Sequence, residues 1–214
     1  MKERFATDRE PGLETTQTVV PFRATPSRMG TATMVRSTLV AASVQSLRAR
    51  GLYDRYAARL AEADRSELAT AVAGQWIPMA LAAAHYGACE SLRLCAGEQL
   101  DIALKVGMHL HGTFLGAMLR MARTVGVTPW GALAYTDKLY ERLFRGGGIA
   151  VTRIGPKDAR VDVVGNALCE MEYFRVGVRG VYQAALELFC ERLSTQEIPR
   201  RYSGLDMAVR ISWA

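Results

Sequence analysis

Histidine is the side chain with the most versatile chemistry in this chain, which contains three of them. His109 and His111 are two residues apart, and on a strand that spacing would point both imidazoles toward one metal ion. The surrounding sequence has the period of a helix, which places the two rings about 200° apart. We therefore do not expect them to share a metal ion.

His85 and Cys89 are four residues apart, a spacing that brings two zinc ligands to one face of a helix. A stable zinc site needs three or four protein ligands, and the sequence offers no recognisable second pair. No metal site is expected. The four cysteines form no CxxC pair, and we expect them to be reduced and structural.

No familiar catalytic motif is present: there is no nucleophile elbow, HExxH, Walker loop or GxGxxG fingerprint. Gly146, Gly147 and Gly148 follow a predicted helix and enter a predicted strand, the reverse of a phosphate-binding loop. We interpret them as a helix C-cap and hinge. No catalytic residues are assigned, and an enzyme with a site assembled from distant residues stays an alternative.

One histidine and four large apolar or aromatic side chains are the candidate ligand-binding residues. His111 lies on a predicted helical face that otherwise carries Leu and Met, including Met118, with Phe114 on a neighbouring face. Trp76 and Tyr86 could line the same cavity. For each residue the alternative is an ordinary place in the core, with His111 bonded to a backbone carbonyl.

The elements that must position these residues are mostly helical from Met34 to Gly146. Gly51 is predicted to end the first helix, and Asp64 with Glu67 resembles a capping box. Glu98 to Thr124 is predicted to be a central helix with apolar residues around most of its surface.

Leu68 to Cys89 contains no charged residue. A transmembrane helix is an alternative for this stretch, but it is rich in alanine and contains Gln75, Pro78 and His85, so we expect a buried helix. Further on, Thr128 and Pro129 predict an N-cap and the first position of another helix.

After the three glycines the apolar period changes to that of strands. The predicted order is strand, strand, helix, strand, strand. Pro199 makes the third of these strands an edge strand or a bulged one. The segments are Ile149–Ile154, Arg160–Val164, Tyr173–Leu193, Thr195–Tyr202 and Leu205–Trp213.

The predicted fold is therefore α+β, an N-terminal helical bundle packed with a C-terminal ββαββ antiparallel-sheet module. Residues 1–33 are expected to be a flexible N-terminal lead with one extended piece at Thr18–Arg23. Residues 34–146 form the helical subdomain and 147–214 the ββαββ subdomain. The two subdomains are expected to make one compact domain.

Composition narrows the function classes. The 214 residues carry 27 Lys and Arg against 21 Asp and Glu, a net charge of +6 that is spread along the chain, so nucleic acid is not an expected partner. The N-terminus has no apolar run of the kind that a signal peptide needs, and a cytoplasmic location is expected.

Several stretches resemble known families. The order of elements resembles the haem-NO-binding and 4-vinyl-reductase-type ligand-binding superfamily. More narrowly, the chain is similar to an uncharacterised family expanded in myxobacteria. The stretches that carry the similarity are Gln75–Pro78, Gly148–Asp162, Phe174–Phe189 and Val209–Trp213.

This resemblance implies a ligand-binding function. Haem-binding members have a proximal histidine, a role that His111 could take, and a Tyr-x-Ser-x-Arg motif that this chain lacks. Haem is therefore disfavoured and no cofactor is expected. The resulting hypothesis is a non-enzymatic sensory or regulatory domain that binds an apolar small molecule in its helical half. The alternatives are a protein-interaction scaffold without a ligand and an enzyme, and a homodimer or another protein partner is left open.

Overall fold

The computed structural model describes residues 17–72, 74–111, 128–202 and 205–214. These residues combine helices with antiparallel sheets, which confirms the predicted α+β class. The first elements along the chain are β1 (Gln17–Val20), a 3-10 helix (Pro26–Arg28) and β2 (Met34–Arg36).

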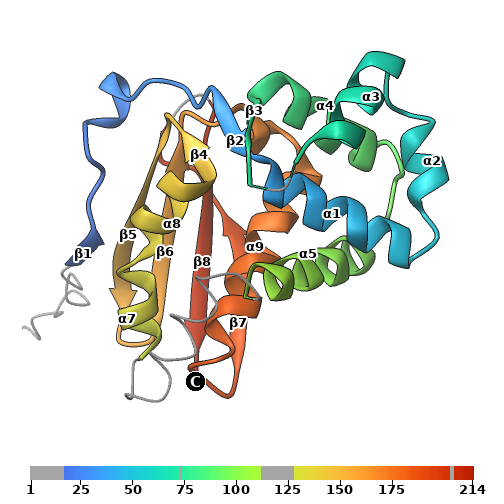
Figure 1. Cartoon of the computed structure of the whole chain (residues 1–214). Coiled ribbons are helices and arrows are strands. Elements are labelled where there is room, and N and C mark those ends of the chain that lie inside the picture. Colours follow the sequence, from blue (N-terminus) through green and yellow to red (C-terminus); the bar gives the residue numbers. More distant parts are fainter. Residues whose placement is uncertain (1–16, 73, 112–127, 203–204) are drawn as a thin grey trace, which may run out of the picture.

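Helices dominate the next part of the chain (Figure 1). The first of these helices is α1, and Gly51, with a φ of +67°, directly follows its C-cap residue. This confirms the prediction that Gly51 ends the first helix. The elements are α1 (Ser37–Ala49), α2 (Tyr53–Ala57), α3 (Glu62–Thr70), β3 (Trp76–Pro78), α4 (Met79–Glu90) and α5 (Ala96–His111).

The remaining elements alternate between helices and strands. Thr128 is the N-cap of helix α7, because its hydroxyl accepts a hydrogen bond from the Gly131 amide at 3.4 Å. This N-cap was predicted from the Thr128-Pro129 pair. The elements are α7 (Pro129–Leu133), α8 (Thr136–Leu143), β4 (Phe144–Arg145), β5 (Gly148–Gly155), β6 (Asp158–Val164), a 3-10 helix (Ala167–Glu170), α9 (Glu172–Leu186), β7 (Leu193–Ile198) and β8 (Met207–Trp213).

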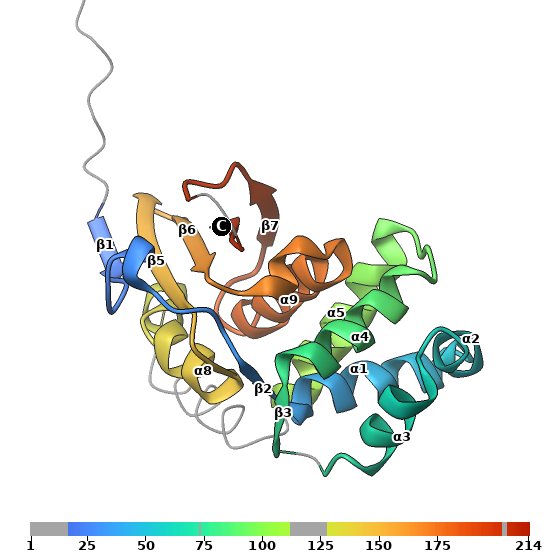
Figure 2. The same ribbon diagram turned by 90° about the horizontal axis from the view of Figure 1, so that it is seen from above.

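Five strands form the larger sheet in the order β1-β5-β6-β8-β7, and every pairing is antiparallel. Val161 is paired with Val151 on one side and Val209 on the other, so all three side chains share one buried face. Helices α8 and α9 cover this concave face of the sheet (Figure 2). The pairing of β-branched residues on one face is the main apolar contribution of the sheet to the core.

A second, three-stranded sheet of very short strands has the order β3-β2-β4. It joins three segments that are far apart in the sequence, with Arg36 paired to Trp76 and Val35 paired to Phe144. This small sheet was not predicted, because strands of two or three residues carry no readable apolar period.

The uncharged stretch from Leu68 to Cys89 is not one buried helix. Helix α3 ends at Thr70, Val72 is 68% exposed, and Gly74 has a φ of +86° that breaks the helical path. Pro78 then precedes the first turn of α4, and only α4 is the buried helix that was expected.

Two other local predictions are wrong. Helix α3 begins at Glu62 after Ala61, without a side-chain cap, so Asp64 and Glu67 lie inside the helix and form no capping box. The glycines do not cap a helix either, because β4 separates them from α8. A Cβ atom at Gly146 would lie 2.3 Å from the Thr31 carbonyl oxygen, so this glycine permits a close approach of two chain segments.

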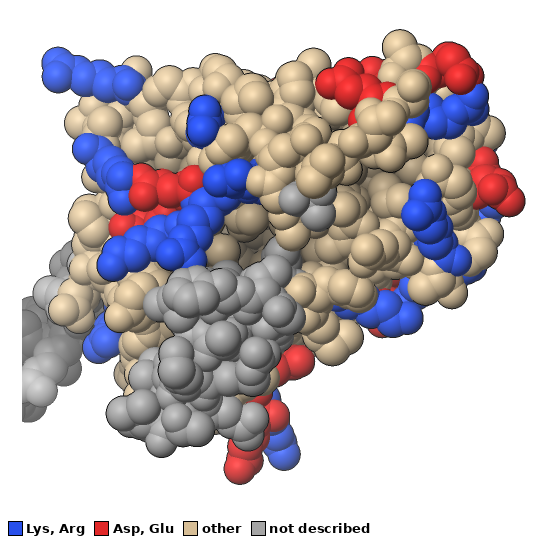
Figure 3. Space-filling view, viewed as in Figure 1, with Lys and Arg blue, Asp and Glu red and all other residues tan. Residues whose placement is uncertain are grey.

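Residues 17–33, part of the expected flexible lead, contain β1, in which Thr18 pairs with Thr152 of β5. Central helix α5 starts at Ala96, and the expected continuation beyond 111 lies outside the described residues. No helix in the described part of the chain is long and apolar enough to cross a membrane. On the face shown in Figure 3, Lys and Arg side chains are interspersed with Asp and Glu.

Candidate ligand-binding site

A cavity of about 140 Å³ lies where the N-terminal helices meet the sheet and its covering helices. Helices α5, α8 and α9 contribute most of its lining, and Figure 2 shows where these three helices lie. The lining is almost entirely apolar and contains no charged side chain among the described residues. It includes Leu39, Ile102, Val106, Leu139, Leu143, Phe144, Ile149, Val163, Phe174, Val178 and Val181.

Small residues bring α5 and α9 into close contact along one side of the cavity. A Cβ atom at Gly180 of α9 would lie 2.3 Å from the Ala103 Cβ of α5, and one at Gly107 would lie 2.7 Å from the Ala184 Cβ. No side chain larger than hydrogen fits at either glycine without moving a helix. The two helices run in the same direction along this contact, because 103 faces 180 and 107 faces 184.

Gly177 lies one turn before Gly180 on α9 and lines the cavity. Unlike Gly180, it is not in close contact with another helix of the described chain. A Cβ atom placed at Gly177 would meet no atom of the described residues within 4 Å. The missing side chain at this position therefore leaves open space in the cavity. Glycine at position 180 allows the two helices to touch, whereas glycine at position 177 leaves space in the cavity.

Polar groups line the cavity at the end formed by α1, α4 and the start of α5 and α9. The hydroxyls of Ser43 and Tyr173 are 3.5 Å apart and both residues line the cavity. Gln99 of α5 lines it as well, and its side-chain amide donates to the Leu94 carbonyl at 2.9 Å. These groups can accept or donate hydrogen bonds, as can the hydroxyls of four other lining residues, Tyr135, Thr136, Tyr140 and Tyr182.

His85 and Cys89 lie behind this end, fully buried in α4. His85 Nδ1 is 2.7 Å from the Tyr56 hydroxyl, and His85 Nε2 is 3.7 Å from the Cys89 sulfur. Burial lowers the pKa of His85 to about 3 and raises the pKa of Cys89 to about 12, so both are neutral near pH 7. Within the described chain no group of three or more His, Cys, Asp and Glu is placed to hold a metal ion.

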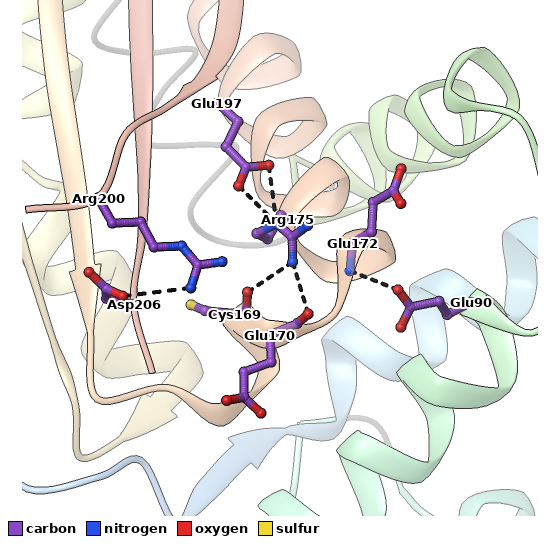
Figure 4. A network of polar contacts seen from close by, with 8 residues as sticks. All are labelled: Glu90, Cys169, Glu170, Glu172, Arg175, Glu197, Arg200 and Asp206. Carbon is purple, nitrogen blue, oxygen red and sulfur yellow. Dashed lines mark hydrogen bonds and ion pairs between the residues drawn. The ribbon is translucent and has the colours of Figure 1, made fainter. Parts of the chain in front are cut away.

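Arg175 holds α9 in position outside the cavity (Figure 4). Its guanidinium donates to the carbonyl oxygens of Cys169 at 3.1 Å and Glu170 at 2.9 Å, and it forms an ion pair with Glu197 of β7 at 2.9 Å. At the start of α9 the Glu172 amide donates to the Glu90 carboxylate of α4 at 3.0 Å. These contacts connect α9 to the sheet and to the helical part.

Of the five candidate ligand-binding residues, Tyr86 and Trp76 can be compared with the cavity in the described part of the structure. Tyr86 is buried in α4 and lines the cavity. Trp76 does not line it, because β3 places the indole ring between cations, with the guanidinium carbons of Arg36 and Arg145 at 4.0 and 4.5 Å from the ring centre.

The other three candidates cannot be compared with the cavity. His111 is the last residue of α5 and its side chain lies outside the described residues, as do Phe114 and Met118 entirely. His109 is exposed, and its Nδ1 donates to the Lys105 carbonyl at 3.0 Å.

Sequence reasoning missed most of the cavity wall, including Gln99, Gly177 and the apolar face of α8. The face of a helix that meets a cavity depends on how helices pack, which no local pattern specifies. The sequence did contain one signal for this part of the wall, the two glycines three residues apart in α9. Glycine is unfavourable inside a helix, so its presence there indicates a special packing environment.

Comparisons with known proteins support a fold assignment. No family model and no curated protein matches the chain. Solved structures of H-NOX domains do match. An oxygen-binding H-NOX domain related to soluble guanylate cyclases is 11% identical with a TM-score of 0.56, and the match covers 83% of this chain and 94% of that one.

Two further H-NOX structures give similar values. One, solved to probe haem distortion in the family, is 15% identical with a TM-score of 0.54 and coverages of 83% and 94%. The other, a variant from T. tengcongensis, is 14% identical with a TM-score of 0.52 and coverages of 83% and 97%. The chain has the fold of H-NOX domains. The myxobacterial and 4-vinyl-reductase-type similarities stay predictions.

This fold corrects one expectation directly. The absence of any cofactor, with haem disfavoured, was expected because the chain lacks a Tyr-x-Ser-x-Arg motif. The structural neighbours with H-NOX folds include proteins whose haem distortion and haem redox potential were studied. Haem is therefore the first cofactor that the fold implies, and a missing sequence motif was not sufficient ground to set it aside.

Proposed function

We propose that this chain is a sensory ligand-binding domain, and that its ligand is a small apolar molecule held in the cavity between α5, α8 and α9. The observation that carries the proposal is the cavity itself, with about 140 Å³ of space and an almost wholly apolar wall. The H-NOX fold supports the sensory part, since oxygen binding is described for one of its structural neighbours.

The size of the cavity indicates the size of the ligand. An engineered cavity of about 150 Å³ lined by Leu, Ile and Phe stays dry and binds benzene or xenon. Sites for drug-sized molecules measure roughly 300–1,000 Å³. A cavity of about 140 Å³ therefore suits a molecule near the size of one aromatic ring.

The cavity wall contains residues from both the N-terminal helices and the sheet, so ligand binding can change how these two parts are arranged. Ile102 and Val106 belong to the N-terminal helices, whereas Ile149 and Val163 belong to the sheet. A ligand that touches both parts favours the relative arrangement in which both walls contact it. The strength of such a signal is set by the difference in affinity between the two arrangements.

Haem is the second candidate, because the structural neighbours favour it. Protein ligands of haem iron are His, Cys, Met or Tyr. Among the described lining residues only tyrosines belong to this set, and no Lys or Arg is present to pair with the two propionates. The described residues alone thus do not fit haem, and the side chain of His111 lies outside them.

Thermal unfolding in the presence of toluene tests the proposal. Toluene at saturating concentration should raise the Tm of the protein in a concentration-dependent manner, since a ligand that binds only the folded state stabilises it. An unchanged Tm would contradict the small-ligand proposal and favour the protein-interaction scaffold.

A haem titration of the same preparation tests the second candidate. A stoichiometric Soret band after addition of haem, together with no effect of toluene, would replace the small apolar ligand by haem. Saturation with toluene and no stoichiometric Soret band would support the first candidate alone.

A further inference from the structure

The small sheet β3-β2-β4 has one buried face and one outer face. Val35 lies opposite Ile77 on one side and Phe144 on the other, and all three side chains are buried. Because side chains alternate along a strand, the neighbours of these residues point to the outer face. Its residues are half-buried or exposed, and they are Met34, Arg36, Trp76, Pro78 and Arg145.

Two guanidinium groups of this outer face gather at one indole ring. The guanidinium carbons of Arg36 and Arg145 lie 4.0 and 4.5 Å from the centre of the Trp76 ring. Arg36 is held in place, since its Nε donates to the Arg142 carbonyl at 3.2 Å and its Nη1 donates to the Gly74 carbonyl. The indole ring attracts both cations but does not neutralise them.

Neither of the two arginines has a carboxylate partner in the described part of the chain. The ion pairs found there include neither Arg36 nor Arg145. The carboxylates of Asp137 and Glu141, in the neighbouring helix α8, pair with Arg23 instead. Arg145 is exposed, so its planar set of N–H donors is accessible to a carboxylate from another molecule.

The residue types of the outer face fit a protein partner. Tryptophan, arginine and methionine are enriched where proteins bind one another. A nucleobase would need a free aromatic face on which to stack, and guanidinium groups already contact the Trp76 ring. A second copy of this chain also has a net charge of +6, which does not complement two arginines. Charge complementarity therefore favours an acidic protein.

The outer face is also connected to the cavity wall through β2 and β4. Phe144, directly before Arg145 in β4, lines the cavity. Leu39, in the first turn of α1 after Arg36, lines it as well. In Figure 1 the small sheet lies between the larger sheet and helices α1 and α4. A shift of β2 relative to β4 changes the spacing of the two guanidinium groups, so a partner that contacts both senses the arrangement of the two parts.

We propose that the outer face of the small sheet is a docking site for an acidic protein segment, whose carboxylates pair with Arg36 and Arg145. The docking site is argued from the contacts at Trp76 alone. Its dependence on a ligand in the cavity rests on the proposed function.

A fluorescently labelled decaglutamate peptide is a suitable probe, because carboxylates are its only side-chain groups. Its fluorescence anisotropy at low ionic strength should show saturable binding to the full-length protein. Arg145→Gln should weaken this binding about three- to tenfold, the effect of losing one charge-assisted pair. Arg59→Gln is the matched control, since it removes another exposed positive charge outside this face, and it should change the Kd by less than about twofold.

Two results would overturn the docking site: no saturable binding of decaglutamate, or equal weakening by Arg145→Gln and Arg59→Gln. Tighter binding of a thymidine decanucleotide, weakened by Arg145→Gln, would replace the acidic protein by a nucleic acid.

The same assay in the presence of toluene tests the connection to the cavity. Saturation with toluene should change the Kd for decaglutamate at least about twofold. If toluene raises the Tm and leaves this Kd unchanged, the connection is wrong and the docking site remains. If toluene does not bind and the Arg145-dependent binding persists, the proposed function fails and the docking site remains.

Discussion

Gly180 of α9 lies directly against Ala103 of α5, so that a Cβ atom at position 180 would be 2.3 Å from the Ala103 Cβ and 2.9 Å from its carbonyl carbon. This contact sets the distance between the two helices that form one side of the cavity. One turn away, Gly177 faces open space. The two glycines thus mark, one turn apart, a close contact between the helices and an open part of the cavity.

Alanine substitutions at the two glycines should have opposite effects on stability. Gly177→Ala should raise the free energy of unfolding by roughly 0.5–1 kcal/mol, because alanine is the better helix former and its methyl group meets no described atom within 4 Å. Gly180→Ala gains the same propensity but forces the helices apart, and overpacking of a core costs about 1–3 kcal/mol. Urea unfolding measures both. Equal stabilisation by the two variants would contradict the close contact.

His85 should make stability depend on pH in the acidic range. Its pKa is about 3 in the folded protein and 6.5 in the unfolded chain, so below pH 6.5 the unfolded state takes up a proton that the folded state does not. The stability due to neutral His85 is complete above pH 6.5 and is lost as the pH falls toward 3. Through this one group the free energy of unfolding changes by at most about 1.4 kcal/mol per pH unit.

The variant His85→Gln isolates this contribution. It should be less stable than wild type at pH 7.5, and the difference should shrink as the pH falls to 5, as measured by urea unfolding at each pH. His109→Gln is the control for the loss of an imidazole, since His109 is exposed, and it should change the stability at pH 7.5 by less than about 0.5 kcal/mol. A pH-independent effect of His85→Gln would show that the imidazole is not held neutral by burial.

Removal of the Arg175 guanidinium should loosen α9 from the sheet. Arg175→Met leaves the carbonyl oxygens of Cys169 and Glu170 without their donor and Glu197 without its ion pair, and a loss of about 1–3 kcal/mol in the free energy of unfolding is expected. Arg65→Met is the control, because its pair with Glu62 is exposed and contributes less than about 1 kcal/mol. Similar effects of the two substitutions would contradict the positioning role of Arg175.

Local signals in the sequence located the four C-terminal strands and the helix between them, although α9 ends at Leu186 rather than at Leu193 and β7 ends at Ile198, before Pro199. Alternation placed Met207, Val209 and Ile211 on the buried face of β8, and Gly155 to Asp158 correctly located the hairpin between β5 and β6. These features depend on residues close in the chain, where side-chain period and turn chemistry act directly.

Features that depend on distant contacts could not be predicted in the same way. The pairing of Val35 with both Ile77 and Phe144 joins segments more than forty residues apart, and it splits the stretch that was expected to be one helix. The extended piece expected at Thr18–Arg23 corresponds in part to β1, but its place at the edge of the sheet beside β5, which buries Val20, depends on a distant contact and was not predicted.

The candidate site was the least predictable part. Tyr86 was found because an aromatic residue in an uncharged helix is a good candidate for a buried wall. Trp76 is also aromatic and lies in the same uncharged stretch, but the short strand β3 places it beside Arg36 and Arg145. Gln99 and Gly177 acquire their roles only through the packing of α5 against α9.

Calorimetric titration of toluene into Gly177→Leu and Gly177→Ala tests most directly whether a ligand binds in this cavity. A leucine at 177 extends into space that none of the described residues occupies, so this variant should fold and should lose toluene binding at least about tenfold, because its side chain takes the place of the ring. Gly177→Ala leaves most of the space and should bind toluene within about threefold of wild type. If a folded Gly177→Leu protein binds toluene as tightly as wild type, the ligand does not bind in the cavity and the account is wrong.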